Sequence, residues 1–318
     1  MKTFSITEAI AEPFRQAGRR PLATTIWGLV LLAPTVLVFA SIIPLIGEMA
    51  EAGFFEPGAN TDVSPFEDDF ATAMQFQAWS NLANLLQLAG LLLVTTAIIR
   101  AVMNGRRGDG IAFLRIGMHE LYVAVAGVAI FVGVMIAVVV AVLLAVGIGL
   151  ALSGLADPWR PLVFVGMGLT LVIGFLALWG RLALIAPASL RYDTFAFVEG
   201  WNLGKGQTWR LLGLLILQFL VAMVIGIALL TLIVLVAMVV GGSVAATDPD
   251  AVLAWLRGLP EQPALLIGLG VVLLLPLAWV QGFSQLLVTA PFARAVLDLA
   301  GEPGPAAANS ADTTPIAH

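Results

Sequence analysis

Six long apolar runs constrain the fold of this chain more than any other feature. Each run meets or exceeds the length of about 20 apolar residues that an α-helix needs to cross a bilayer. Within lipid, the backbone hydrogen bonds of a spanning segment must be made internally, so each run is expected to be a helix. The sequence therefore predicts an all-α integral membrane protein with six transmembrane helices, at about 22–46, 78–103, 121–153, 162–190, 210–242 and 264–290.

Composition supports the same class and offers little for catalysis. Of the 318 residues, 60% are hydrophobic and 11% are charged, whereas soluble domains carry about 25% charged residues. The chain has no cysteine, which excludes disulfides and thiolate chemistry, and its histidines are His119 and His318. His119 next to Glu120 could be an acid/base pair, but adjacent residues diverge on a helix, which favours a solvated helix start. No enzymatic activity, cofactor, metal site or nucleic-acid partner is predicted.

The distribution of basic residues predicts the orientation. Thirteen of the 15 Lys and Arg residues fall on one side of the six-span layout, and Arg160 and Arg257 fall on the other. The positive-inside rule then places both termini in the cytoplasm. The opposite 1–2 loop is acidic. It is either a cation-attracting vestibule or simply a translocated loop without basic residues. Its acidic residues are Glu48, Glu51, Glu56, Asp62, Glu67, Asp68 and Asp69.

Internal similarity indicates three parallel units of two spans each. "LLVTTAIIRAV" at 92–102 matches "LLVTAPFARAV" at 286–296, which aligns Arg100 with Arg294. "DGIAF" at 109–113 matches "DTFAF" at 193–197, and the amphipathic N-terminal stretch is a looser third copy. Each unit is expected to hold a short interfacial amphipathic helix followed by two spans. The predicted six-span domain covers 1–300, with units at about 1–105, 106–191 and 192–300, and 301–318 is a disordered cytoplasmic tail.

The stretch "RYDTFAFVEGWNLGKGQTWRLL" at 191–212 is the most polar part of the C-terminal half. It lacks the spacing of a phosphate-binding loop, because three residues instead of four separate Gly200 from Gly204, and Gly206 replaces the hydroxyl residue. Gly204 and Gly206 instead predict a turn between an interfacial helix and the fifth span. Phe195, Val198 and Trp201 would face the membrane, with Trp209 in an aromatic belt.

The same region resembles a broad bacterial family of uncharacterised polytopic proteins. These proteins are related to the membrane domain of glycerophosphodiester phosphodiesterases and include the YciC-type inner-membrane proteins. The resemblance covers about 40 residues and rests on Trp201, Leu203, Lys205, Gly206, Trp209, Arg210, Leu211 and Leu212. The chain departs from the usual family pattern at Gly200, where Ser is common, and at Gly204, where Thr is common. The resemblance implies a membrane-domain architecture and a location in a bacterial cytoplasmic (inner) membrane. It implies no activity, because a fused diesterase would bring its own soluble barrel.

Two sets of residues are candidates for contacts with ligands. Basic residues at the cytoplasmic helix ends could bind anionic lipid headgroups; they are Arg181, Arg191, Lys205 and Arg210. Arg181 lies within span 4 and could instead extend its side chain to the interface. Polar residues within the spans could line a path or a lipid-headgroup pocket. They could equally be interhelical contacts worth about 0.6 kcal/mol each. These residues are Asn81, Asn84, Gln87, Gln218, Gln281, Ser284 and Gln285.

The sequence favours a non-catalytic protein that organises or senses lipid, or that serves as a membrane module for partner proteins. Its expected partners are membrane lipids, above all anionic phospholipid headgroups. A homo-oligomer or a membrane-protein partner is also possible, because Ala141, Ala145, Gly149 and Ser153 form a small-residue ridge suited to close helix packing, within the monomer or in a dimer. The alternative is a small-solute transporter or channel that uses the polar stripes on spans 2 and 6.

Overall fold

The structure is a computed structural model that describes residues 3–51, 70–103, 111–114, 117–151, 159–245 and 263–301. In these ranges the chain forms helices and turns and no strand, and six helices are long and apolar enough to cross a membrane. The predicted all-α membrane class is thereby confirmed. The elements are α1 (Ile6–Arg19), α2 (Pro21–Glu51), α3 (Phe70–Met103), η1 (Ile111–Phe113), α4 (Met118–Ala151), α5 (Trp159–Leu182), α6 (Ile185–Tyr192), α7 (Phe197–Leu203), α8 (Thr208–Ala245) and α10 (Pro263–Ala300).

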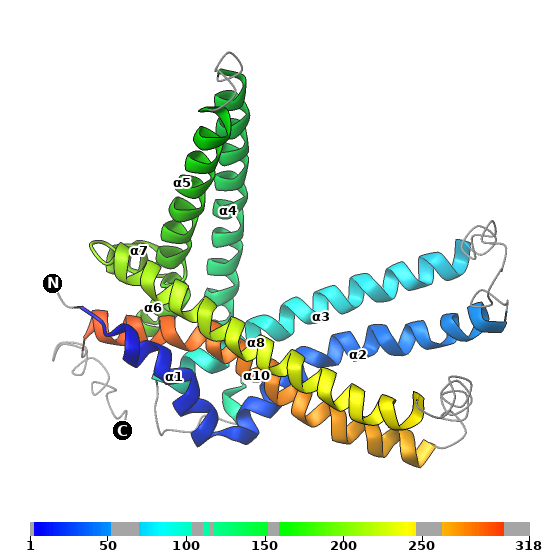
Figure 1. Cartoon of the computed structure of the whole chain (residues 1–318). Coiled ribbons are helices and arrows are strands. Elements are labelled where there is room, and N and C mark those ends of the chain that lie inside the picture. The colour runs from blue at the N-terminus through cyan, green and yellow to red at the C-terminus, as the bar shows by residue number, and fades with distance from the viewer. Residues whose placement is uncertain are drawn as a thin grey trace, which may run out of the picture.

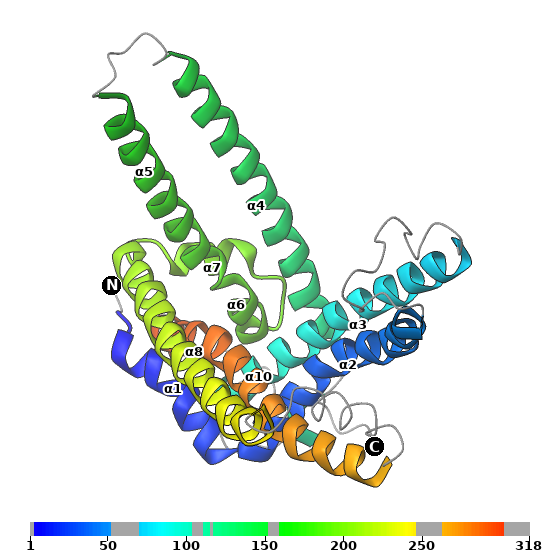
Figure 2. The ribbon, with the colours of Figure 1, turned by 45° about the vertical axis from the view of Figure 1, so that its right-hand side comes forward.

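The long helices form three hairpins that diverge from a shared base (Figures 1 and 2). The hairpins pair α2 with α3, α4 with α5, and α8 with α10. The base consists of α1, η1, α6, α7 and the adjoining ends of the long helices, and we call it the platform. Most of the buried side chains belong to the platform and the adjoining helix ends, whereas every described residue of α4 from Gly127 to Ala151 is at least partly exposed. The hairpins therefore offer long apolar surfaces to their surroundings.

The packing of the helices is cyclic. The first helix of each hairpin contacts the second helix of the preceding hairpin: α4 contacts α3, and α8 contacts α5. The order closes where α10, the last helix, packs against α2 and α1. Trp27 of α2, Ile98 of α3 and Leu286 of α10 are fully buried in the core cluster at this closure. The two ends of the described chain thus lie together in the platform (Figure 1).

Glycine allows α2 and α10 to cross at backbone contact. A Cβ added to Gly28 of α2 would overlap the carbonyl oxygen of Ala278, and one added to Gly282 of α10 would overlap the carbonyl oxygen of Thr24. Small residues of this kind let membrane helices approach closely and gain dispersion contacts along their length. The crossing is the closest approach between long helices that the described glycines make, and it holds the N-terminal and C-terminal hairpins together.

The structure confirms the extent of the fourth predicted span and changes that of the sixth. The fourth span, predicted at 162–190, corresponds to the apolar stretch Pro161–Tyr192, within which a turn at residues 183–184 separates α5 from α6. The sixth helix does not end near residue 290, since α10 continues through Pro291 to Ala300. Its final turns bury Phe292 and Val296 against α1, α6 and α8, and this packing compensates for the hydrogen bond that Pro291 cannot donate. The acidic 1–2 loop beyond Glu51 and the predicted tail from 302 lie outside the described residues.

Helix α1 is amphipathic in the predicted place, but the face that it buries is partly polar. Ser5 caps the helix, its Oγ accepting from the amide of Glu8 at 3.4 Å. Ala9 and Ala17 are buried, and so are the side chains of Glu12 and Gln16. The helix packs on α10 and α8. The buried carboxylate of Glu12 needs polar partners, and Gln16 of the same helix is one of them.

Candidate functional site

The platform gathers the positive charge of the described structure. Each Lys or Arg whose side chain is described lies on a platform element or at the adjoining end of a long helix. Such clustering is what the positive-inside rule expects for one side of a membrane protein. These residues are Arg15, Arg19, Arg20, Arg100, Arg181, Arg191, Lys205, Arg210 and Arg294.

Arg100 at the end of α3 forms a buried ion pair with Glu120 at the start of α4. Its Nη2 lies 2.6 Å from Glu120 Oε1, and the two side chains are 9% and 12% exposed. Arg100 Nη1 also donates to the carbonyl of Phe113 at 3.4 Å, while Glu120 Oε2 accepts from the amide of Gly117 at 2.7 Å. Each charged group therefore has a second partner, as a buried pair requires. Glu120 is thus a structural partner, and nothing is described of the side chain of His119.

Segment η1 lies next to this pair and also contacts α2. Trp27 donates from Nε1 to the carbonyl of Ala112 at 2.8 Å. The guanidinium of Arg20 lies 4.4 Å from the centre of the Phe113 ring, a cation–π contact. Burial and then the nearby Arg19 lower the pKa of Arg20, yet an arginine at the lower end of its range stays charged at neutral pH. Positive φ angles of 53° at Ala112 and 61° at Phe113 turn the chain tightly enough for these contacts.

Arg181 at the end of α5 occupies a similar joint with α7 and α8. Its Nη2 donates to Thr208 Oγ1 at 2.6 Å, and its guanidinium lies 5.5 Å from the centre of the Trp201 ring. A Cβ on Gly204 would lie 3.0 Å from Arg181 Cγ, so glycine leaves the space that this side chain fills. Arg181 therefore connects the end of α5 to α7 and α8, the helices on either side of the turn at residues 204–206.

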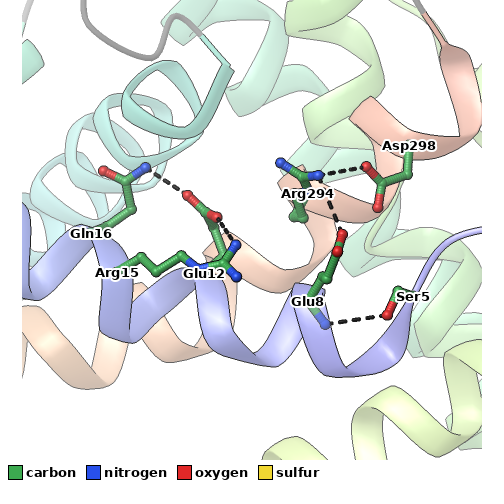
Figure 3. A network of polar contacts seen from close by, with 7 residues as sticks. All are labelled: Ser5, Glu8, Glu12, Arg15, Gln16, Arg294 and Asp298. Carbon is green, nitrogen blue, oxygen red and sulfur yellow. Dashed lines mark hydrogen bonds and ion pairs between the residues drawn. The ribbon is translucent and has the colours of Figure 1, made fainter.

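Arg294 on α10 makes the third joint, with α1 (Figure 3). Its Nη2 lies 3.5 Å from Glu8 Oε2 and 3.1 Å from Asp298 Oδ1. Further along α1, Gln16 donates from Nε2 to Glu12 Oε1 at 2.7 Å, and Arg15 Nη1 lies 3.9 Å from Glu12 Oε2. The short hydrogen bond from Gln16 is the partner that the buried Glu12 needs.

These three arginines share one structural role. Each lies near the platform end of the second helix of a hairpin. Arg100 and Arg181 contact the segment that begins the next hairpin, and Arg294, on the last hairpin, contacts α1, which precedes the first. Arg100 and Arg294 also align in the internal sequence similarity, whereas Arg181 does not. The sequence pointed to the two arginines as a repeated feature. It gave no signal for Glu120 and Glu8 as their partners.

Of the four predicted headgroup residues, three have protein partners. Besides the contacts of Arg181, Arg191 donates from Nη2 to the carbonyl of Gly301 at 2.9 Å, and Arg210 donates from Nη1 to the carbonyl of Phe4 at 3.1 Å. Lys205 is exposed, and its side-chain ammonium makes no hydrogen bond or ion pair within the described ranges, while its backbone N–H donates to the carbonyl of Asn202. Arg181, Arg191 and Arg210 therefore connect parts of the platform, whereas the Lys205 side chain is free in the described structure.

The predicted turn is present, and its surroundings are apolar and exposed. Residues 204–206 form the turn, and Gly206 has a φ of 77°, the left-handed region that favours glycine. Beside the turn, Trp209 is 80% exposed and Val198 is 63% exposed. Trp201 is partly buried, and the guanidinium of Arg181 lies over its ring.

The predicted polar residues of the spans differ in their partners and exposure. Gln285 donates from Nε2 to Thr95 Oγ1 on α3 at 3.1 Å, and Ser284 bonds the carbonyl of Val280 in its own helix. Asn81 and Asn84 are exposed on α3, and Asn81 accepts from Gln77. In the described ranges no hydrogen bond joins Asn81, Asn84 or Gln87 to Gln281, Ser284 or Gln285. Gln218 on α8 stands apart because it is buried and its Oε1 has no hydrogen-bond partner in the same ranges.

The small-residue ridge on α4 faces α5. Ala141 and Ala145 line an apolar groove of about 590 Å³ between the two helices. A Cβ on Gly149 would lie 3.6 Å from the ring of Phe164 on α5. The described part of the ridge therefore lies on the α5 side of α4, next to Phe164 at Gly149 and across the groove at Ala141 and Ala145, and Ser153 lies outside the described residues.

Comparison of the chain with protein-family models, with curated proteins and with solved structures finds no match. Among the described residues, no three His, Asp or Glu side chains lie close enough together to hold a metal ion.

Proposed function

We propose that this chain is a non-catalytic protein of a bacterial inner membrane that binds anionic phospholipid headgroups at the rim of its platform. The platform would face the cytoplasm, because the described Lys and Arg side chains gather there and basic residues favour that side. The resemblance to proteins related to the membrane domain of glycerophosphodiester phosphodiesterases agrees with this location. It adds no activity to the proposal.

The free charge of Lys205 in the turn, four residues before the exposed ring of Trp209, is the observation that carries the proposal. Lysine and tryptophan are a common pair at the membrane surface, where the ammonium meets phosphate and the indole sits at the level of the headgroups. The neighbouring arginines are already engaged by protein carbonyls and hydroxyls. Lys205 is therefore the cation of this region whose charge is available to a lipid.

The divergent hairpins support a close relation with lipid. Leu143 and Leu150 of α4 are 65% and 71% exposed, and Phe219 of α8 is 68% exposed. In a bilayer such surfaces are covered by acyl chains or by another membrane protein. A platform that carries the basic residues, with long apolar hairpins extending from it, would organise the lipids around it or bind a partner protein along the hairpins.

Lipid analysis of the purified protein tests the proposal. We expect anionic phospholipid to co-purify in excess over its share of the membrane, and Lys205→Gln to reduce that excess by about fivefold, the worth of roughly one charge at an anionic surface. Arg19→Gln is the matched control, since it removes an exposed platform charge away from the turn. Equal lipid composition for the natural chain and Lys205→Gln would contradict the proposal.

A further inference from the structure

A second candidate ligand site is an apolar groove between two of the long helices. A groove of about 710 Å³ runs between α5 and α8, within the range of about 300–1,000 Å³ that small-molecule sites occupy. One wall is the stacked pair of Phe175 and Trp179, whose ring centres lie 6.2 Å apart. The lining includes Phe175, Leu176, Trp179, Gln218, Phe219 and Val288.

Gln218 is the one amide in this lining, and its hydrogen bonding is incomplete. The residue is 8% exposed, and its Oε1 has no hydrogen-bond partner in the described ranges. It lies ten residues after Thr208, which corresponds to about 15 Å along the helix axis. No bulk water is available in the hydrocarbon region, so a buried amide there needs a partner from the protein or from a ligand. A rotation of the amide by 180° presents either its acceptor or its donors to the groove.

The groove supplies one more polar atom and no charge. Trp179 is 41% exposed, and its indole N–H makes no hydrogen bond to the described part of the chain. Among the described residues, no Lys, Arg, Asp or Glu lines the groove. An occupant therefore needs a donor for Gln218, an acceptor for Trp179 and otherwise apolar surface. A charged headgroup would find no counter-ion.

We propose that this groove binds a neutral lipid with a free hydroxyl group, of the diacylglycerol type. The hydroxyl donates to the Gln218 amide oxygen, an ester carbonyl accepts from the Trp179 indole, and an acyl chain follows Phe175 and Phe219. The site is separate from the anionic surface at Lys205, and it extends the proposed function from the headgroup layer into the apolar groove.

Binding of two matched probes to the purified full-length chain tests the inference. The probes are 1,2-dioleoylglycerol and the same diester of 1,2-propanediol, which lacks the hydroxyl. By native mass spectrometry in detergent we expect a preference of about fivefold for the hydroxyl lipid, the worth of one hydrogen bond. Gln218→Met, which keeps the length of the side chain, should lose the preference. Gln285→Met should keep it, since that amide is bonded to Thr95.

The outcomes separate this inference from its competitors. Equal binding of the two probes by the natural chain would overturn it, as would an undiminished preference in Gln218→Met. A dimer that Gln218→Met dissociates, without any preference between probes, would overturn it in favour of a second copy covering the groove. An unchanged unfolding midpoint in Gln218→Met shows that a lost preference does not come from misfolding. Lys205→Gln should leave the preference intact, so failure of the anionic-lipid proposal is seen separately.

Discussion

Arg100 and Glu120 join the first hairpin to the second through a buried ion pair of 2.6 Å. Removing one partner leaves a buried charge without compensation, which costs about 3–5 kcal/mol. We therefore expect Arg100→Met to lower the free energy of unfolding by about that amount in detergent micelles. Arg100→Met combined with Glu120→Met should recover a large part of the loss. A single variant as stable as the natural chain would show that the pair does not hold this joint.

The crossing of α2 and α10 predicts a strong effect from one added methyl group. Gly282→Ala places a Cβ onto the carbonyl oxygen of Thr24, so the helices must separate. Overpacking usually costs about 1–3 kcal/mol, and backbone overlap places this variant at the upper end. Gly166→Ala on α5 is the matched control, because a Cβ there meets nothing within 4 Å and alanine is the better helix former. Chemical unfolding of the two variants should move in opposite directions.

The joint at Arg181 requires the shape of guanidinium as well as its charge. Arg181 both donates to Thr208 and lies over Trp201, and lysine cannot reproduce this combination of planar stacking and hydrogen bonding. We expect Arg181→Lys to lower the free energy of unfolding by about 1–2 kcal/mol. Arg191→Lys should lose less, because the side chain of Arg191 donates to one carbonyl, that of Gly301. Greater loss in Arg191→Lys would contradict the assigned role.

Solute flux separates the lipid proposal from a transporter or channel. Because Gln285 of α10 is hydrogen-bonded to Thr95 of α3, and Ser284 to the carbonyl of Val280, these stripe residues are engaged by the protein, and we expect proteoliposomes to show the same ion and small-solute flux as protein-free vesicles. The natural chain should behave like a variant with Asn84→Leu and Gln285→Leu. Flux through the natural chain that this double variant abolishes would support the transport alternative.

The sequence predicted the helices well and their partners poorly. Apolar runs of more than 20 residues located all six long helices, and Gly204 and Gly206 located the turn before α8. The spans are apolar on every side, so their sequences carry little information on which face packs. The break at residues 183–184 and the extension of α10 past Pro291 both depend on tertiary packing in the platform. The partners of Arg100 and Arg294 depend on it as well, and the repeat boundaries at 105 and 191 remain a prediction.

Fluorescence of Trp209 tests the central claim most directly, because this exposed ring lies in the first turn of α8, four residues after Lys205. The protein is reconstituted in two lipids with the same brominated acyl chains, one with an anionic and one with a zwitterionic headgroup. The Trp209 signal is the difference between the natural chain and Trp209→Phe, which removes the contribution of the other tryptophans. We predict stronger quenching of this signal in the anionic lipid and loss of the difference in Lys205→Gln. Equal quenching in both lipids would contradict the account.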